Sequence, residues 1–304
     1  MIDSPIVAVF KRYLSLVALV VLATLLTACN GDTSLTSKTT PDTQPVITVT
    51  TTTDSAPSSD DEPAPQPESA PTVADITDLI LVTGQSNALG AGTSFDESLD
   101  ASDDRVFAFT ENGWQVASLR QVWDQGWFPR TDPNTDPTNN FSLHFGKRVV
   151  ERSPDRVVGF ILITAPGQAI SYWQPQGEFF SEIRNKVSWA ISDLPSKSSV
   201  DGILWHQGES DGRDDHYYGD TLYELITSFQ NEPWFAPGRP FICGETASLP
   251  VNNQLQKLNN DDNPNTGCIA AEGLPTRPDG AHFTAESLRI MGQRYGDLYV
   301  DMTQ

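Results

Sequence analysis

Three short segments of the sequence carry side chains that could perform acyl-transfer chemistry. The first is Thr83-Gly84-Gln85-Ser86-Asn87, in which a glycine precedes the serine by two residues. Glycine permits a tight turn, and a serine at such a turn can point its hydroxyl into a cleft and act as a nucleophile. Gly-x-Ser turns also occur in loops that do no chemistry, so this segment alone leaves both interpretations open.

The other two segments supply a candidate base and a group of polar side chains. Asp279-Gly280-Ala281-His282 lets a carboxylate accept from one imidazole nitrogen while the other nitrogen faces a nucleophile. Taken alone, an Asp-Gly turn near a histidine is ordinary. Trp205-His206-Gln207-Gly208-Glu209-Ser210-Asp211 gathers polar side chains around one glycine, which a loop that only faces solvent would rarely need. We expect His206 to pack beside Gln207 rather than to bind a metal ion.

The elements that must position these segments are predicted from Ile76 onward, where short apolar runs alternate with helical patterns. The runs are apolar on successive residues, as in a parallel sheet covered on both faces. The predicted strands are Leu79–Val82, Val157–Ile163, Val200–Trp205, Pro240–Cys243 and Cys268–Ala271. We expect an α/β fold, a three-layer α/β/α sandwich with a mainly parallel five-stranded sheet. Ligands of such sheets bind beyond the carboxyl ends of the strands, where Ser86 and Gln207 follow.

Four helices are predicted from apolar residues at helical spacing. They cover Phe141–Val150, Phe180–Leu194, Tyr218–Phe229 and Thr284–Tyr295, the last capped by its threonine. The connection from about Phe95 to Asn139 is long enough to suggest function or mobility. Its aromatic side chains, which could stack on sugar rings or cover the floor of a cleft, are Trp114, Trp123, Trp127 and Phe128.

Taken together and in this order, Gly84-Gln85-Ser86-Asn87, His206-Gln207-Gly208-Glu209 and Asp279-Gly280-Ala281-His282 resemble the motifs of the SGNH hydrolase superfamily. The most similar branch is carbohydrate esterase family 6, with the sialate O-acetylesterase-like proteins. The resemblance extends from about Asp78 to the end of the sequence. It implies a serine esterase that removes acetyl groups from carbohydrates through an acyl-enzyme and needs no metal or organic cofactor.

The resemblance also implies a role for each motif residue. Ser86 is the nucleophile, His282 is the general base, and Asp279 fixes the histidine tautomer. The oxyanion is bound by the backbone N–H groups of Ser86 and Gly167 and by the side-chain amide of Gln207. Gly167 is assigned because its segment matches the family's glycine-rich second block.

Further polar residues are expected to support this site, namely Gln85, Asn87, Glu209 and Asp211. We expect the two acids to orient Gln207 and the loop of Ser86. The sequence departs from the family's usual pattern at Ala88, where methionine is common, and at Pro166, where glycine is common. These changes leave the three catalytic candidates in place and alter the pocket around them.

Composition limits the alternatives. The 304 residues allow one substantial domain with extra segments. With 40 acidic and 19 basic residues, the formal net charge is −21, which argues against nucleic-acid binding. Three cysteines and four histidines cannot build a Cys-rich zinc site or a disulfide-dense scaffold. Whether Cys243 and Cys268 pair is left open by the sequence.

The N-terminal part is predicted to be a targeting signal followed by a linker. In residues 1–28, two basic residues precede an apolar run of signal-peptide length. The run ends in Leu26-Thr27-Ala28-Cys29, which resembles the lipobox of bacterial lipoproteins and implies a lipid on Cys29. Asn30 favours the outer membrane of a bacterial cell envelope. Residues 29–75 are rich in Thr, Ser and Pro, which predicts a disordered linker before an esterase domain at 76–304.

The sequence leaves other functions open. Acetylated xylan or a similar polysaccharide is preferred over sialic acid, because an acidic surface repels polyanions. A non-catalytic carbohydrate-binding surface lipoprotein is one alternative. A sialate O-acetylesterase or a lipid-type acyl hydrolase of the same superfamily is another.

Overall fold

The computed structural model describes residues 69–90, 94–118, 140–211, 215–247, 249–260 and 263–304, all within one compact unit. The predicted signal peptide, Cys29 and most of the predicted linker lie outside the described residues, as do Trp123, Trp127 and Phe128. Among the helices that are described, none has both the length and the apolar character needed to cross a membrane.

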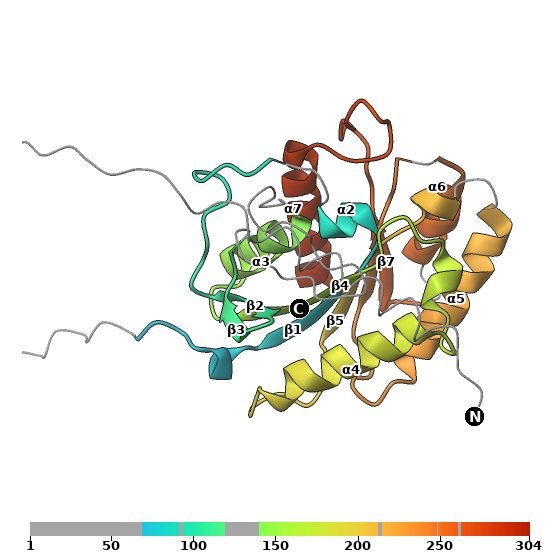
Figure 1. Cartoon of the computed structure of the whole chain (residues 1–304). Helices are drawn as coiled ribbons and strands as arrows, with labels where there is room; N and C mark the ends of the chain where they lie inside the picture. The colour runs from blue at the N-terminus through green and yellow to red at the C-terminus, as the bar shows by residue number, and fades with distance from the viewer. Residues whose placement is uncertain (1–68, 91–93, 119–139, 212–214, 248, 261–262) are drawn as a thin grey trace, which may run out of the picture. The chain divides into compact units, whose positions relative to one another are not determined.

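A seven-stranded sheet forms the centre of the domain, in the order β3-β2-β4-β1-β5-β6-β7 (Figure 1). All neighbouring strands are parallel except β2 and β3. The strands are β1 (Asp78–Gly84), β2 (Val106–Thr110), β3 (Gly113–Val116), β4 (Val158–Thr164), β5 (Gly202–His206), β6 (Phe241–Gly244) and β7 (Thr266–Ile269). The mainly parallel α/β sheet is confirmed, and all five predicted strands are present with ends shifted by one or two residues.

The predicted count of five strands is wrong, because the connection from Phe95 to Asn139 contains the antiparallel pair β2 and β3. β2 is buried at every residue and extends the sheet beside β4. Trp114 of β3 packs its ring against Phe109 and donates its indole N–H to the carbonyl of Ala190, 3.0 Å away. This tryptophan therefore fastens the edge of the sheet to a covering helix.

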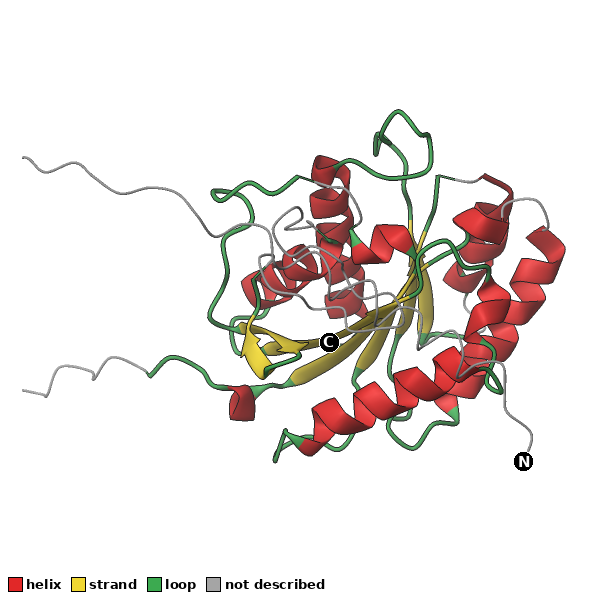
Figure 2. Ribbon diagram, in the orientation of Figure 1, coloured by secondary structure: helices red, strands yellow, loops and turns green. Residues whose placement is uncertain are grey.

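Two layers of helices enclose the sheet (Figure 2). The helices are α2 (Ser86–Leu89), α3 (Phe141–Arg152), α4 (Glu178–Ser192), α5 (Asp215–Gln230), α6 (Leu249–Leu255) and α7 (Ala285–Met302). Short 3₁₀ turns are η1 (Val73–Asp75), η2 (Ile170–Trp173), η3 (Glu209–Asp211) and η4 (Gln256–Asn259). Helices α3 and α7 pack on one face, and α4, α5 and α6 on the other. The predicted three-layer sandwich is therefore confirmed.

Successive residues of β1 pack alternately against the two helix layers. Leu79 and Leu81 join the core beneath α4 and α5, whereas Ile80 and Val82 join the core beneath α3 and α7. All four are fully buried, which is why β1 appears in the sequence as a continuous apolar run. The strand that leads to Ser86 is thus enclosed on both faces.

A disulfide joins Cys243 of β6 to Cys268 of β7. The two residues are direct partners in the register of these strands, with Cα atoms 4.4 Å apart. The pairing that the sequence left open is present, and it links the two outermost strands at this edge of the sheet.

A buried ionic network ties the segment before β2 to both helices of one layer. The Asp100 side chain has no exposed surface and accepts two hydrogen bonds from Arg289 of α7, at 2.8 and 2.7 Å. His144 of α3 contacts the same carboxylate at 2.8 Å. Burial alone would raise the pKa of Asp100, but hydrogen bonds from Arg289 and other neighbours hold that pKa below its ordinary value. Burial lowers the pKa of His144, so the arginine carries the compensating charge.

We expect Arg289→Ala to lower the free energy of unfolding by about 3 kcal/mol, because it leaves a buried carboxylate without its cationic partner. Urea unfolding of the purified protein measures this change. The control is Gln293→Ala, an exposed position one turn along α7, for which we expect a change within about 0.5 kcal/mol. Equal stabilities for the two variants would show that the network does not stabilise the fold.

Candidate active site

Ser86 lies at the carboxyl end of β1 because Gly84 allows an unusually close turn. Gly84 has a φ of 146°, and a Cβ atom at this position would lie 2.0 Å from the carbonyl oxygen of His206. The next residue, Gln85, donates its backbone N–H to that same oxygen at 3.0 Å. The turn after β1 is therefore held against the end of β5, and α2 begins at Ser86.

The structure brings Ser86, His282 and Asp279 into one line of hydrogen bonds. Oγ of Ser86 lies 2.8 Å from Nε2 of His282, and Nδ1 of His282 lies 3.1 Å from Oδ2 of Asp279. The histidine and the carboxylate belong to the loop before α7, whose first turn is capped by the side chain of Thr284. Residues from opposite ends of the domain sequence thus meet at the carboxyl edge of the sheet.

The carboxylate of Asp279 is held in place by the backbone of its own loop. Oδ1 accepts the N–H groups of His282, at 2.8 Å, and Ala281, at 2.9 Å. These two hydrogen bonds, the His282 bond first, lower the pKa of Asp279 to about 2. An ionised carboxylate accepts a hydrogen bond from Nδ1–H, which leaves Nε2 free to accept the hydroxyl proton of Ser86.

Gln207 follows β5 and is fully buried. Its Nε2 atom lies 2.6 Å from Oδ2 of Asp211, 3.1 Å from the carbonyl of Gln168 and 3.3 Å from Oε1 of Gln85. Three acceptors therefore surround two amide hydrogens. Donation from Gln207 to an oxyanion would require one of these contacts to be released.

Asp211 joins the segment after β5 to the segment after β4. Besides the amide of Gln207, its Oδ2 atom accepts the backbone N–H of Ile170 at 2.9 Å. Burial raises the pKa of Asp211, and these two hydrogen bonds oppose the rise. Asp211 thus contacts Gln207, the residue that the sequence predicted it to orient.

Gly167 lies in the turn after β4, next to the turn that carries Ser86. The strands β4 and β1 are neighbours, and the backbone N–H of Ala165 donates to the carbonyl of Gly84 at 2.8 Å. Gly167 is exposed and has a φ of 75°, a conformation that favours glycine. The three sequence segments named for the oxyanion therefore end at the same edge of the sheet.

Asn87 and Glu209 connect the loops of the site. The side-chain amide of Asn87 donates to Oε1 of Glu209 at 2.5 Å and to the carbonyl of Ala281 at 3.0 Å, and its Oδ1 accepts the N–H of Phe283 at 3.0 Å. The sequence predicted that Glu209 would support the loop of Ser86, and it contacts the residue after the serine. The contacts of Asn87 to the histidine loop were not predicted, because no local pattern links positions so far apart.

His206 is fully buried between the rings of Phe141 and Phe283, with centroids 5.9 Å from each. Its Nδ1 atom lies 3.3 Å from the hydroxyl of Tyr295, and its Nε2 atom lies 3.6 Å from Oε1 of Glu209. His206 therefore packs behind the site, as predicted.

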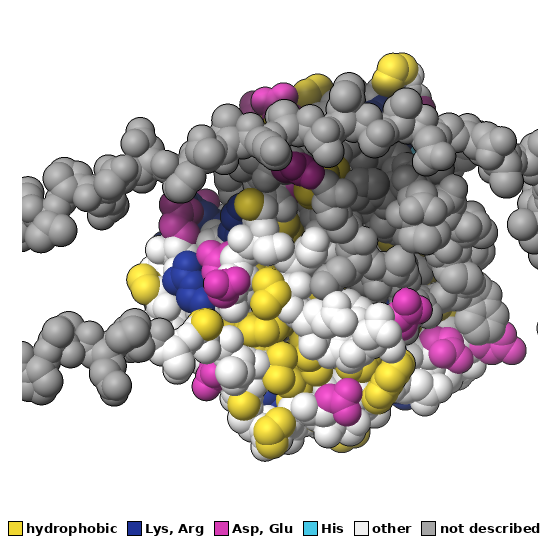
Figure 3. Space-filling view, turned by 60° about the vertical axis from the view of Figure 1, so that its left-hand side comes forward, with side chains coloured by type: hydrophobic (Ala, Val, Ile, Leu, Met, Phe, Trp, Pro, Cys, Tyr) yellow, Lys and Arg dark blue, Asp and Glu magenta, His cyan; other side chains and the backbone are white. Residues whose placement is uncertain are grey.

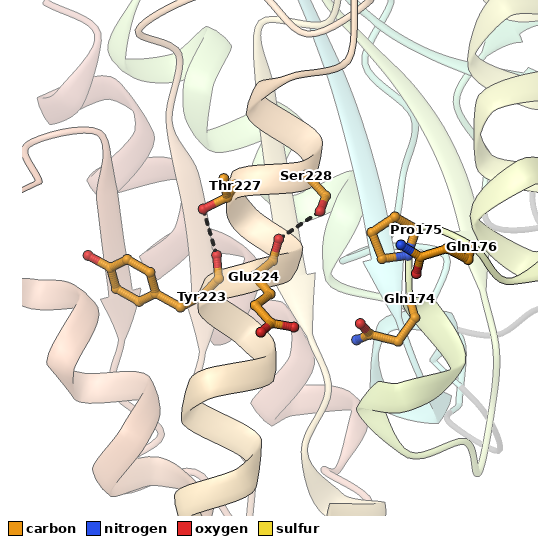
Figure 4. Close-up of a pocket in the computed structure, with 7 residues that line it drawn as sticks. All are labelled: Gln174, Pro175, Gln176, Tyr223, Glu224, Thr227 and Ser228. Atoms are coloured by element: carbon orange, nitrogen blue, oxygen red, sulfur yellow. Dashed lines mark hydrogen bonds between the residues drawn. The ribbon is translucent and has the colours of Figure 1, made fainter.

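A groove of about 400 Å³ lies between the connection from η2 to α4 and the outer surface of α5 (Figure 4). Tyr223, on its rim, is 59% exposed. The hydroxyls of Thr227 and Ser228 donate to backbone carbonyls of their own helix, at 2.9 and 2.7 Å. The remaining lining residues are Gln174, Pro175, Gln176 and Glu224. Its lining mixes polar and apolar side chains and includes neither Ser86 nor His282.

A serine, a histidine and a carboxylate joined by hydrogen bonds at the carboxyl edge of a parallel sheet are the arrangement typical of α/β serine hydrolases. Residues 76–301 match the family described as carbohydrate esterase, sialic acid-specific acetylesterase, and the chain belongs to this family. The resemblance indicated by the sequence motifs is thereby confirmed, and the family is one of carboxylic ester hydrolases.

Among curated proteins, the chain is similar to the Arabidopsis thaliana protein named "Probable carbohydrate esterase At4g34215", with 24% identity over 151 residues. The match covers 47% of this chain and 56% of that relative, which is little more than half its length.

Solved structures share the fold. The Arabidopsis thaliana protein AT4G34215 superimposes with a TM-score of 0.56 and 21% identity, over 74% of this chain and 98% of that one. NanS superimposes with a TM-score of 0.55 and 15% identity, over 75% of this chain and 98% of NanS. XAC1771, a carbohydrate acetylesterase from Xanthomonas citri, superimposes with a TM-score of 0.52 and 17% identity, over 73% of this chain and 55% of XAC1771.

We expect the pKa of Asp279 to stay well below 3.8 in a His282→Ala variant, because the two backbone N–H groups that lower it remain. A carbon-13 NMR titration of the aspartate carboxyls in both proteins measures this. A return of the pKa to its ordinary value would show that the imidazole, and not the loop backbone, keeps the carboxylate ionised.

Proposed function

We propose that this chain is a serine esterase that removes O-acetyl groups from carbohydrates through an acyl-enzyme on Ser86. The observation that carries the proposal is the hydrogen-bonded line from Ser86 through His282 to Asp279. Membership of the carbohydrate esterase family supports the reaction class.

The geometry supports a two-step reaction. Oγ of Ser86 attacks the acetyl carbonyl while Nε2 of His282 takes the hydroxyl proton. The resulting imidazolium, stabilised by Asp279, gives that proton to the sugar oxygen as the ester bond breaks. A water molecule, deprotonated by His282, then attacks acetyl-Ser86, and collapse of the intermediate releases acetate and returns the proton to Oγ.

The oxyanion formed in each step would be bound at the shared edge of β1, β4 and β5. We propose the backbone N–H groups of Ser86 and Gly167 as donors, with the amide of Gln207 as a third. Removing one such donor typically costs on the order of 3 kcal/mol in the transition state. Because Gln207 is already bonded to Asp211, its contribution would follow a small shift of the amide on substrate binding.

For the substrate, we propose a neutral acetylated polysaccharide such as acetylated xylan. The formal net charge of −21 repels polyanions, and Figure 3 shows acidic side chains scattered over one face of the domain. The second candidate is an O-acetylated sialic acid, which is favoured by the description of the family.

We also propose that a lipid on Cys29 anchors the chain to the outer membrane of a bacterial cell envelope. In this organisation residues 1–28 are a removable signal peptide, residues 29–75 are a flexible linker, and residues 76–304 are the esterase domain. The support is the apolar run that ends in Leu26-Thr27-Ala28-Cys29.

We expect Ser86→Ala to abolish hydrolysis of p-nitrophenyl acetate, and Asp279→Asn to lower kcat by about 10⁴-fold through the wrong histidine tautomer. Ser181→Ala, an exposed serine of α4, is the matched control and should behave as wild type. Unchanged hydrolysis in Ser86→Ala would refute the catalytic proposal and favour a non-catalytic carbohydrate-binding protein.

Acetate release distinguishes the substrates. We expect release from acetylated xylan to exceed release from O-acetylated sialic acid, because the acidic surface disfavours an anionic sugar. The reverse order would identify the sialic acid as the substrate class. A rate that rises from acetate to octanoate esters would instead indicate a lipid-type acyl hydrolase.

We expect Cys29→Ser to move the full-length chain from the membrane fraction to the soluble fraction of a Gram-negative host, because the thiol that would carry the lipid is lost. Fractionation followed by immunoblotting measures this. A variant that stays in the membrane fraction would show that the lipid is not the anchor.

A further inference from the structure

Asn87 directly follows Ser86 and bonds to both neighbours of His282. Its Nδ2 donates to the carbonyl of Ala281 at 3.0 Å, and its Oδ1 accepts the N–H of Phe283 at 3.0 Å. These two bonds bracket the residue that carries the imidazole. The residue after the nucleophile is therefore attached to the loop on both sides of the base.

These contacts close a ring through the site. It runs from Oγ of Ser86 along the backbone to Asn87, across the side-chain amide to the histidine loop, and back through Nε2 of His282 to Oγ. The distance between base and nucleophile is therefore fixed by a short path, even though the two residues are far apart in the sequence. A misplacement of about 1 Å can cost roughly 100-fold in rate.

Glu209 reinforces the orientation of the Asn87 amide that the histidine loop requires. Oε1 of Glu209 accepts the second Nδ2 hydrogen at 2.5 Å. A carboxylate accepts but does not donate, so a rotated amide would place Oδ1 against Glu209 and the carbonyl of Ala281, and Nδ2 against the N–H of Phe283. Each of these contacts would be repulsive. Glu209 therefore adds to the preference that Ala281 and Phe283 already impose.

The polar atoms of the Asn87 side chain are already used within the protein. The amide donates to Glu209 and Ala281 and accepts from Phe283, and the residue is 2% exposed. We therefore expect Asn87 to act on the reaction through the loop that carries His282.

We propose that Asn87 and Glu209 are positioning residues that hold the imidazole of His282 at hydrogen-bond distance from Ser86. Asn87 makes the connection, and Glu209 acts through its hydrogen bond to Asn87 rather than through its contact with His206. The inference rests on the proposed esterase function, since it describes how the base is presented to the nucleophile.

The test is a double-mutant cycle on the full chain with p-nitrophenyl acetate. We expect Asn87→Ala to lower kcat by about 100-fold and Glu209→Ala by about tenfold, with KM changed by less than about twofold in both. The double variant should match Asn87→Ala alone, because the proposal routes the effect of Glu209 through Asn87 and not through its contact with His206. Glu209→Gln, which keeps an acceptor oxygen for Asn87, should recover activity to within about threefold of wild type.

Two control measurements distinguish a misplaced base from an unfolded variant. Urea unfolding reports whether each variant is folded under assay conditions. If Asn87→Ala is not, Asn87→Asp replaces it, since it retains the size and the acceptor for Phe283 but loses the donor to Ala281. A fluorophosphonate probe measures the reactivity of Ser86 without a sugar, and it should slow in parallel with kcat.

The outcomes separate the two proposals. Wild-type protein that neither hydrolyses the ester nor reacts with the probe would refute the esterase function, and the positioning role with it. Active wild-type protein with a folded Asn87→Ala variant of equal kcat would refute only the positioning role. Multiplicative effects in the double variant would show that Glu209 reaches the reaction without Asn87.

Discussion

The close contact between Gly84 and the carbonyl of His206 is the constraint on which the site depends. A side chain at Gly84 would occupy the position of that carbonyl group, so the turn after β1 could no longer lie against the end of β5. The backbone hydrogen bond from Gln85 to the same oxygen fixes the position of Ser86 relative to the end of β5. Because β4 lies on the other side of β1, the turns that carry Ser86, Gly167 and Gln207 are neighbours.

The second requirement is that the loop before α7 reaches this edge from the far end of the sequence. α7 packs closely on α3, since a Cβ atom at Gly292 would lie 2.4 Å from the carbonyl of Phe141. The network around Asp100 joins the same two helices. The position of His282 is thus set by helix packing on one face, and the hydrogen bonds of Asn87 then fix it relative to Ser86.

Much of the fold could be predicted from the sequence because its strands are buried on both faces, which makes them continuous apolar runs. The pair β2 and β3 was missed although a signal was present. Asn112-Gly113 between two apolar segments is a strong hairpin pattern, but the polar residues around it resemble a loop. Trp114 was assigned to that loop for the same reason, whereas its contact with Ala190 depends on a helix that follows much later in the chain.

The sequence by itself determined the fold class through its continuous apolar runs. Through the resemblance of three motifs in order, it also determined the family and the candidates Ser86, Asp279 and His282. Only the tertiary structure decided that Cys243 pairs with Cys268. It also decided that the amide of Gln207 is bonded to Asp211, and that Asn87 joins the serine turn to the histidine loop. Each of these depends on the distance between residues that are remote in sequence. That distance is set by strand order and helix packing, and no local pattern encodes it.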